Sequence, residues 1–318
     1  MSDFLSFLIL GITRGSAYAL VALGYTLVYG VLQLINFAHS EVFMSGAFGS
    51  YLVVHFLVGD GANTATWVVP FVIIAALAAG AVTGAAVAWT LERVAYRPLR
   101  RRGAPKLAFL ISAIGASFLL SQLFGKTFNR QGNNTIPNFF DTNATVLTIP
   151  GTEARINLIQ TIVIGSAIVM MLFLDRLVSG TKLGRSIRAT AEDAPTAALM
   201  GINIDKTISR TFMIGGALAG AAGFLFATAF GAFSYNMGFT PGIKAFAAAV
   251  LGGIGNIRGA MIGGLLLGML EALIPFAPWT SAAWIGQNWT DVVAFVILVA
   301  ILVLRPTGIL GERLGRAA

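Results

Sequence analysis

The chain has 318 residues, of which 57% are hydrophobic and only 11% are charged, with a formal net charge of +8. An ordinary soluble domain carries about 25% charged residues, so this chain has too few charges to cover a water-exposed surface. A cytosolic enzyme, a nucleic-acid-binding domain and a disordered chain are excluded, and a polytopic membrane protein is expected. Cysteine is absent, which removes disulfides, thiolate metal sites and a cysteine nucleophile.

Membrane-spanning helices are expected wherever about 20 mainly apolar residues follow one another. In chain order such segments lie at 15–35, 42–58, 67–91, 107–124, 156–174, 211–230 and 290–304, and a glycine-broken apolar stretch lies at 244–275. Residues 4–10 are expected to lie in the membrane interface instead. The sequence therefore predicts one all-α transmembrane bundle over residues 1–318, with about eight spans and one re-entrant segment.

The basic residues are concentrated in a few segments of the chain. The segments 92–106 and 175–210 and the tail after 304 hold 15 of the 21 lysines and arginines. Such segments face the cytoplasm in membrane proteins, whereas the Asn- and Thr-rich segment 125–155 is expected outside. Alternation of the spans then places the C-terminus in the cytoplasm and the N-terminus outside, and it requires 244–275 to begin and end outside.

Polar residues interrupt one apolar stretch at 36–41, where Asn36, Phe37, His39 and Glu41 follow closely on one another. Discontinuous helices line substrate paths in transporters, and irregular backbone at membrane depth survives only inside protein or beside water. The break is therefore a candidate pathway element. The alternative is a plain turn between two spans, in which Asn36 or Ser40 caps a helix.

Glycines interrupt a second apolar stretch at 252–259, which includes Gly252, Gly253 and Gly255. This break is also a candidate pathway element. The alternative, which is compatible with it, is close helix packing through Gly255, Gly259 and Gly263 at four-residue spacing. The stretch lacks the third glycine of a dinucleotide fingerprint, and the chain has no P-loop motif. If transport is active, another subunit must hydrolyse the ATP.

The segment 175–210 predicts a short helix between two spans. Asp193 is placed to cap it, Pro195 suits its first turn and Gly201 suits its end. Asn203 is placed to cap the next span. A helix of about two turns is too short to be stable alone, so it requires a membrane surface or a groove on a partner. Spacing alone favours a structured loop over a helix that couples to an ATPase.

Several stretches resemble one family of transport proteins. Residues 191–194 together with Gly201 resemble the ATPase-contacting motif of bacterial ABC importer permeases. Four longer stretches are similar to the H-type permeases of branched-chain amino acid importers: Gly15 to His39, Glu92 to Leu99, Lys244 to Gly264, and Arg305 to Gly311. Ser40 departs from the pattern, because the family usually has glycine after the histidine.

The resemblance implies a permease subunit in the cytoplasmic (inner) membrane of a bacterium, without a metal or cofactor of its own. Its implied partners are a second homologous permease, two ATP-binding cassette subunits and an extracytoplasmic substrate-binding protein. The residues implied for ATPase coupling are Arg188, Glu192, Asp193, Ala194 and Gly201. The candidate pathway residues are Asn36, Phe37, His39, Glu41, Phe246, Gly252, Gly253 and Gly255.

Two other classes of function compete with this interpretation. A passive channel or secondary transporter for a small polar solute, such as urea or an amide, would not need the 191–201 segment. Its ion-coupling acids would be Glu41 and Glu271, since charged residues within spans are functional by default. A membrane enzyme is disfavoured, because no catalytic constellation is present. His39 and Glu41 also lack the four-residue spacing that puts two metal ligands on one helix face.

Overall fold

The structure is a computed structural model that describes residues 2–34, 36–59, 67–128, 134–137, 139–141, 144–148, 155–274, 289–305 and 307–311. In chain order its helices are α1 (Ser2–Leu32), α2 (His39–Val58), α3 (Val69–Leu91), the π-helical turn η1 (Glu92–Tyr96), α4 (Arg97–Arg101), α5 (Lys106–Thr127), α6 (Leu158–Gly180), α7 (Lys182–Glu192), α8 (Ala194–Leu199), α9 (Ile204–Phe230), α10 (Phe239–Gly252), α11 (Ile257–Leu273) and α12 (Thr290–Leu304). Two short strands, β1 (Thr145–Thr148) and β2 (Arg155–Asn157), pair antiparallel.

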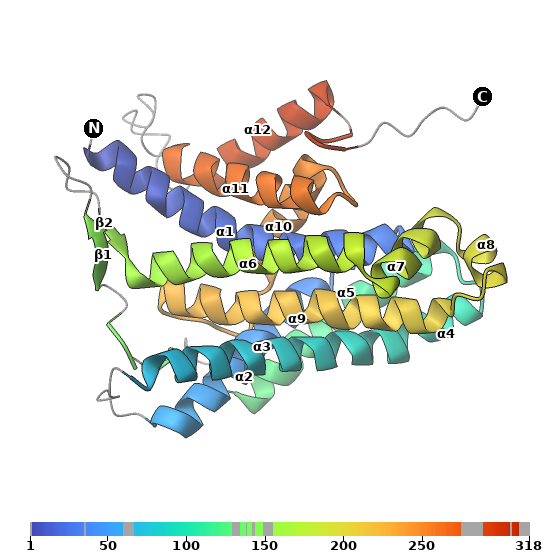
Figure 1. Cartoon of the computed structure of the whole chain (residues 1–318), viewed down its shortest axis with the longest axis horizontal. Coiled ribbons are helices and arrows are strands. Elements are labelled where there is room, and N and C mark those ends of the chain that lie inside the picture. The colour runs from blue at the N-terminus through green and yellow to red at the C-terminus, as the bar shows by residue number, and fades with distance from the viewer. Residues whose placement is uncertain are drawn as a thin grey trace.

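The long helices lie side by side along the longest axis of the molecule (Figure 1). The N-terminus and the strand pair β1–β2 lie at one end of the bundle, and α4, α7 and α8 lie at the other. The two basic segments 92–106 and 175–210 therefore share one end, as their common assignment to one side of a membrane requires. The basic tail residues after 311 lie outside the described residues, as do residues 129–133, 138, 142–143 and 149–154 of the segment 125–155.

Within the described residues, six helical stretches are long and apolar enough to cross a membrane. They are α1, α2, α3 continued through η1 and α4, α5, α6 and α9. α10, α11 and α12 are shorter, so the count of eight spans stays a prediction. The expectation for residues 4–10 was wrong in one respect: they continue α1 as unbroken helix, because the apolar sequence from Phe4 onward supports helix without interruption.

Glycines bring the central helices into backbone contact. Gly80 and Gly84 of α3 face Gly216 and Gly220 of α9, and Gly46 of α2 also faces Gly220. A Cβ atom at Gly220 would overlap the backbone carbonyl of Gly80. Small residues at such crossings let helix backbones approach closely, which is the usual source of packing energy between helices in a membrane.

A Gly220→Ala substitution is therefore expected to destabilise the fold by about 1–3 kcal/mol, because the added methyl group overpacks the crossing of α3 and α9. Gly165→Ala in α6 is the matched control, since a Cβ there meets no atom within 4 Å. The control should be neutral or slightly stabilising through its higher helix propensity. Thermal unfolding of both variants in detergent tests the difference, and equal midpoints would contradict this account of the crossing.

Candidate translocation pathway and coupling segment

The first break lies inside the bundle, not at its surface. α1 ends at Leu32, yet His39, the first residue of α2, packs against Gly24 of α1. Gly24 precedes the end of α1 by eight residues, or about 12 Å of helix, so the imidazole of His39 reaches well back along α1. The turn is therefore deeper than a plain connection between two spans, and α2 starts in the interior.

Side-chain hydrogen bonds fix the backbone of this break. The Oδ1 atom of Asn36 accepts from the hydroxyl of Tyr96 at 2.7 Å and from the amide of Ala38 at 3.1 Å. The hydroxyl of Ser40 donates to the carbonyl of Phe37 at 2.7 Å. Asn36 is buried, so these bonds satisfy polar groups that have no access to water. The break is tied to η1, which begins the basic segment at the end of the bundle.

The N-termini of α2 and α10 meet at this depth. Gly238 and Gly242, at the start of α10, both lie against Ser40 in the first turn of α2. Each helix N-terminus carries a partial positive charge from its aligned peptide dipoles, although the amides of Ala38, His39 and Glu41 at the start of α2 already have acceptors. The start of α2 is buried, and helix N-termini inside the bundle are the elements with which discontinuous helices hold an anionic group in transporters.

A carboxyl group lies at this junction. Glu41 is 3% exposed, and its Oε1 atom accepts from the hydroxyl of Ser117 at 3.1 Å. Its Oε2 atom, which lies near Gly238, has no hydrogen-bond partner among the described residues, and neither does Nε2 of the buried His39. Buried polar atoms without partners are rare and call for a functional explanation.

Aromatic rings close the space between the two breaks. Phe37 and Phe246 lie 6.0 Å apart by ring centroid, and Tyr25 contacts both Phe246 at 5.9 Å and His39 at 4.7 Å. The hollow between them has a volume of about 10 Å³, which is at the lower limit for a single water. It is lined by Tyr25, Thr26, Tyr29, Leu34, Asn36, Phe246, Ala249 and Ile254. The structure thus brings Asn36, Phe37, His39 and Phe246 into one cluster in a closed state.

The second break depends on glycine for its backbone. Gly253 and Gly255 have φ angles of +106° and +94°, values that side-chain-bearing residues rarely adopt. Gly252 packs against Gly259 of α11, and the amides of Ile309 and Leu310 donate to the last carbonyls of α10. The break therefore contacts α11 and the segment 307–311, and a pathway role for Gly252, Gly253 and Gly255 stays a prediction.

The packing alternative for this break is confirmed in part. Gly259 and Gly263 face Gly252 and Ala248 of α10, so α10 and α11 form a tight antiparallel hairpin. Gly255 does not contribute to that contact, because a Cβ there would meet no atom within 4 Å. Its φ angle, not its packing, accounts for glycine at this position.

Glu271 forms part of an ion cluster between the last helices. The ammonium of Lys244 lies 2.5 Å from Oε1 of Glu271 and 2.8 Å from Oδ1 of Asp291, so α10, α11 and α12 are joined. Lys244 and Glu271 are buried, whereas the Asp291 side chain is 47% exposed. Glu271 is therefore charge-paired, and it is a weaker candidate for ion coupling than its sequence suggested.

Replacing Lys244 by methionine is expected to destabilise the fold by about 3–5 kcal/mol, because it leaves the carboxylate of Glu271 buried without a counter-ion. Asp291→Asn is the control and should cost about 1 kcal/mol or less, since that partner is half exposed. A double variant, Lys244→Met with Glu271→Gln, should recover most of the loss. Thermal unfolding of the three proteins checks this order, and an unchanged midpoint for Lys244→Met would contradict it.

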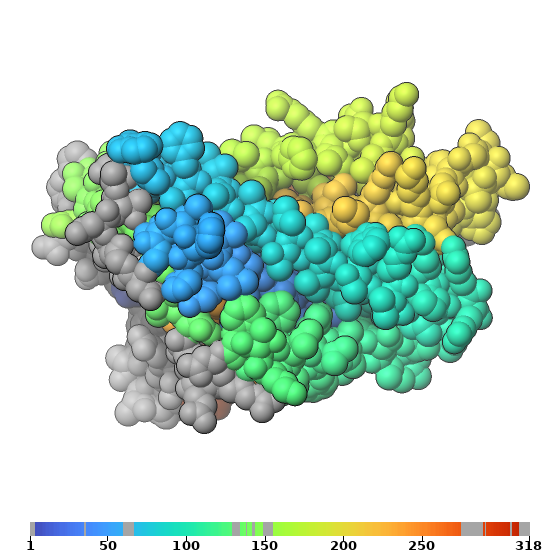
Figure 2. All heavy atoms as spheres, turned by 90° about the horizontal axis from the view of Figure 1, so that it is seen from below, coloured from blue at the N-terminus to red at the C-terminus, as the bar shows by residue number. Residues whose placement is uncertain are grey.

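The capping residues of the coupling segment were predicted correctly. Asp193 caps α8 by accepting from the amide of Thr196, and Pro195 lies in the first turn. Gly201 follows the helix with a φ angle of +85°, and Asn203 caps α9 by accepting from the amide of Lys206. The sequence did not indicate α7, which Thr181 caps through the amide of Gly184. α7 and α8 together project at one end of the molecule (Figure 2).

The segment from α7 to Gly201 presents an exposed apolar tip that sequence reasoning missed. Leu199 and Met200 are 88% and 80% exposed, and Glu192 at the end of α7 is also exposed. Their position directly before Gly201 was the available clue, because a helix end at a loop tip leaves its last side chains uncovered. Arg188, by contrast, donates to the carbonyl of Val178 in α6. It anchors α7 to a span, while Ala194 is simply the first residue of α8.

Helices that begin inside a bundle of membrane-length helices, around a closed polar junction, define the chain as a polytopic transport protein. The family model for the permease component of the branched-chain amino acid transport system matches residues 7–302. The chain belongs to this family of membrane permeases.

Individual relatives are similar to this chain over nearly its whole length. The high-affinity branched-chain amino acid transport system permease protein LivH of Salmonella typhimurium is 41% identical over 309 residues, covering 97% of this chain and 96% of that protein. LivH of Escherichia coli K12 is 41% identical with the same coverage. The permease protein BraD of Pseudomonas aeruginosa is 41% identical over 309 residues, again covering 97% and 96%. These relatives are permease proteins and not enzymes.

Proposed function

We propose that the chain is the membrane subunit of an ABC importer for branched-chain amino acids, located in the cytoplasmic membrane of a bacterium. Separate ATP-binding cassette subunits supply the energy, and an extracytoplasmic binding protein supplies the substrate. The complex contains two ATPases and a second, related permease. The observation that carries the proposal is the capped helix α8 with its exposed tip, in a chain that matches this family from end to end.

The orientation follows from the distribution of charge. The end that carries α4, α7 and α8 faces the cytoplasm, because it holds the arginine- and lysine-rich segments. The N-terminus and the β1–β2 pair then face the outside. α8 is thereby placed where an ATPase can bind it.

The substrate of such an importer is a zwitterion with an apolar side chain. We assign its ammonium group to the unpartnered Oε2 of Glu41 and its carboxylate to the adjoining N-termini of α2 and α10. The cluster of Tyr25, Phe37 and Phe246 supplies an apolar wall, and it closes the way to the cytoplasm in this state. Opening requires these rings to separate.

Coupling runs from α8 into the bundle through α9. The loop at Gly201 joins α8 directly to α9, whose glycines pack against α1, α2 and α3. Arg188 fixes α7 to α6. Because these contacts are close, movement of α8 by an ATPase displaces α6 and α9 as rigid bodies without bending them.

Reconstitution of the transporter in proteoliposomes tests the proposal. Uptake of radiolabelled leucine should require ATP, both kinds of partner subunit and the binding protein. Uptake by the purified chain alone, at a rate that ATP does not change, would instead identify a passive channel.

A further inference from the structure

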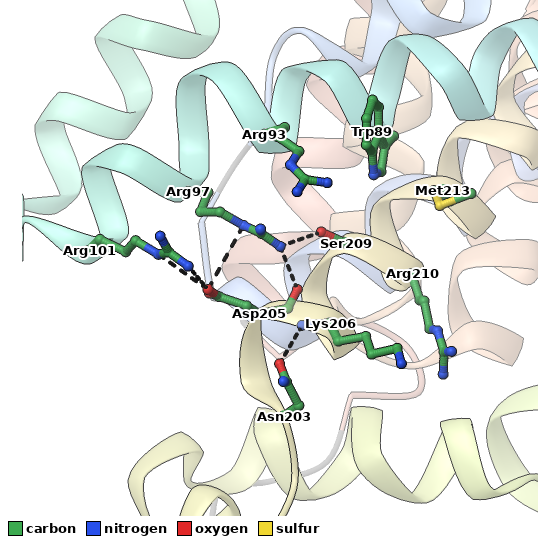
Figure 3. A pocket seen from close by; sticks show the side chains of 10 residues that line it. All are labelled: Trp89, Arg93, Arg97, Arg101, Asn203, Asp205, Lys206, Ser209, Arg210 and Met213. Carbon is green, nitrogen blue, oxygen red and sulfur yellow. Dashed lines mark hydrogen bonds and ion pairs between the residues drawn. The ribbon is translucent and has the colours of Figure 1, made fainter.

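The bundle carries a basic cavity that the transport pathway does not use. It lies between the end of α3 and the start of α9 and has a volume of about 400 Å³. Figure 3 shows Arg93 and Arg97 extending from η1 and α4 toward α9, while Lys206 and Arg210 extend from α9 itself. The lining residues are Trp89, Arg93, Arg97, Arg101, Asn203, Asp205, Lys206, Ser209, Arg210 and Met213.

Two of the lining arginines are already neutralised. Arg101 forms a salt bridge of 2.8 Å with Asp205, and Arg100 forms a second salt bridge of 2.5 Å with the same carboxylate. Arg97 pairs with Glu92, which is fully buried beside it, and donates to the hydroxyl of Ser209 at 3.0 Å. These bonds hold η1 and α4 against α9 and thereby fix the walls of the cavity.

Three cations in the cavity have no acidic partner among the described residues: Arg93, Lys206 and Arg210. Arg93 instead stacks on the ring of Trp89, with its guanidinium carbon 5.1 Å from the centroid. Arg93 borders the cavity from η1, and Lys206 and Arg210 border it from α9, so its positive charge comes from both walls. The lining is therefore complementary to a group that carries negative charge and several acceptor oxygens.

The cavity opens beside an apolar surface. Trp89 and Val82 lie exposed on α3, and Met213 lies exposed on α9. Tryptophan at the end of an apolar span marks the boundary between hydrocarbon and headgroups. A ligand here therefore has its charged part among the cations and an apolar part along α3. A soluble anionic partner would pair with the cations but would not cover the exposed apolar face of α3.

We propose that this cavity binds the phosphodiester headgroup of an anionic phospholipid, whose acyl chains lie along the exposed face of α3. Basic pockets between spans are suited to such headgroups. Arg93, Lys206 and Arg210 contact the phosphate oxygens, and Trp89 lies at the level of the glycerol backbone. The bound lipid holds the ends of α3 and α9 together beside the ion pairs of Glu92 and Asp205.

Titration of the full chain in uncharged detergent with fluorescent phosphatidylglycerol tests this site. Phosphatidylglycerol should bind at least about tenfold more tightly than phosphatidylcholine, and the preference should weaken as salt rises from about 0.1 M to about 1 M. The double variant Lys206→Gln with Arg210→Gln should lose on the order of tenfold in affinity. Lys182→Gln with Arg185→Gln removes the same charges from the exposed face of α7 and should leave the affinity unchanged.

Three outcomes would overturn the proposal. Equal losses in the two double variants would mean that only overall charge matters. Competition by glycerol 3-phosphate as effective as that by the lipid would identify a site for free phosphate compounds. Unchanged lipid binding by the Lys206 and Arg210 variant, together with poorer recovery of the ATPase subunits, would identify a protein-docking surface.

Discussion

Replacing Glu41 by glutamine is expected to lower leucine uptake by the assembled transporter by about 10- to 100-fold. The substitution keeps the size of the side chain and its bond to Ser117, but it removes the charge that we assign to the substrate ammonium. A hydrogen bond to a charged group is worth about 1.5–3 kcal/mol in such a setting. Uptake into proteoliposomes measures the loss, and co-purification of the ATPase subunits should be unaffected.

Asp291→Asn serves as the matched control for this prediction. It also removes one carboxylate from the helical bundle, but this carboxylate is half exposed and belongs to the ion cluster around Lys244, not to the junction of α2 and α10. Uptake by this variant should stay near that of the unchanged protein. If Glu41→Gln transports as well as Asp291→Asn, Glu41 does not contact the substrate.

Replacing both Leu199 and Met200 by glutamate is expected to abolish assembly with the ATPase subunits. A few apolar anchors at the centre of an interface carry most of its binding energy, and losing one costs about 2 kcal/mol or more. Burying two new charges adds a further cost. The expected weakening is therefore at least about 100-fold, measured as the ATPase retained on the immobilised permease.

Leu147→Glu in β1 is the control for that experiment, because Leu147 is also exposed but lies at the opposite end of the bundle. It should leave ATPase binding intact. If the double variant at 199 and 200 still assembles normally, α8 is not the docking element, and the proposed coupling route through α9 fails with it.

The spans and the helix caps could be predicted from sequence because both depend on local chemistry. A long apolar run predicts a span wherever it occurs. Asp193 and Asn203 cap their helices through amides only three residues further on, so the evidence for them lies within one turn. The same local logic predicted the turn at Gly201.

The depth of the first break and the pairing within the ion clusters could not be predicted. Asn36 bonds to Tyr96, and Lys244 bonds to Glu271, across long separations in sequence. No pattern near either residue indicates its partner. The helix α7 was missed because a short polar segment acquires its structure from the helices that it packs against.

The segment 307–311 makes the folding of α10 depend on residues that are synthesised later. The last carbonyls of α10, at Leu251 and Gly252, receive their hydrogen bonds from the amides of Ile309 and Leu310. A helix end without partners is costly to bury, so α10 cannot reach its final state until the ribosome has made the residues after α12. A chain that stopped before residue 309 would therefore leave these two carbonyls of α10 without their partners, and a quality-control protease would find this helix end open.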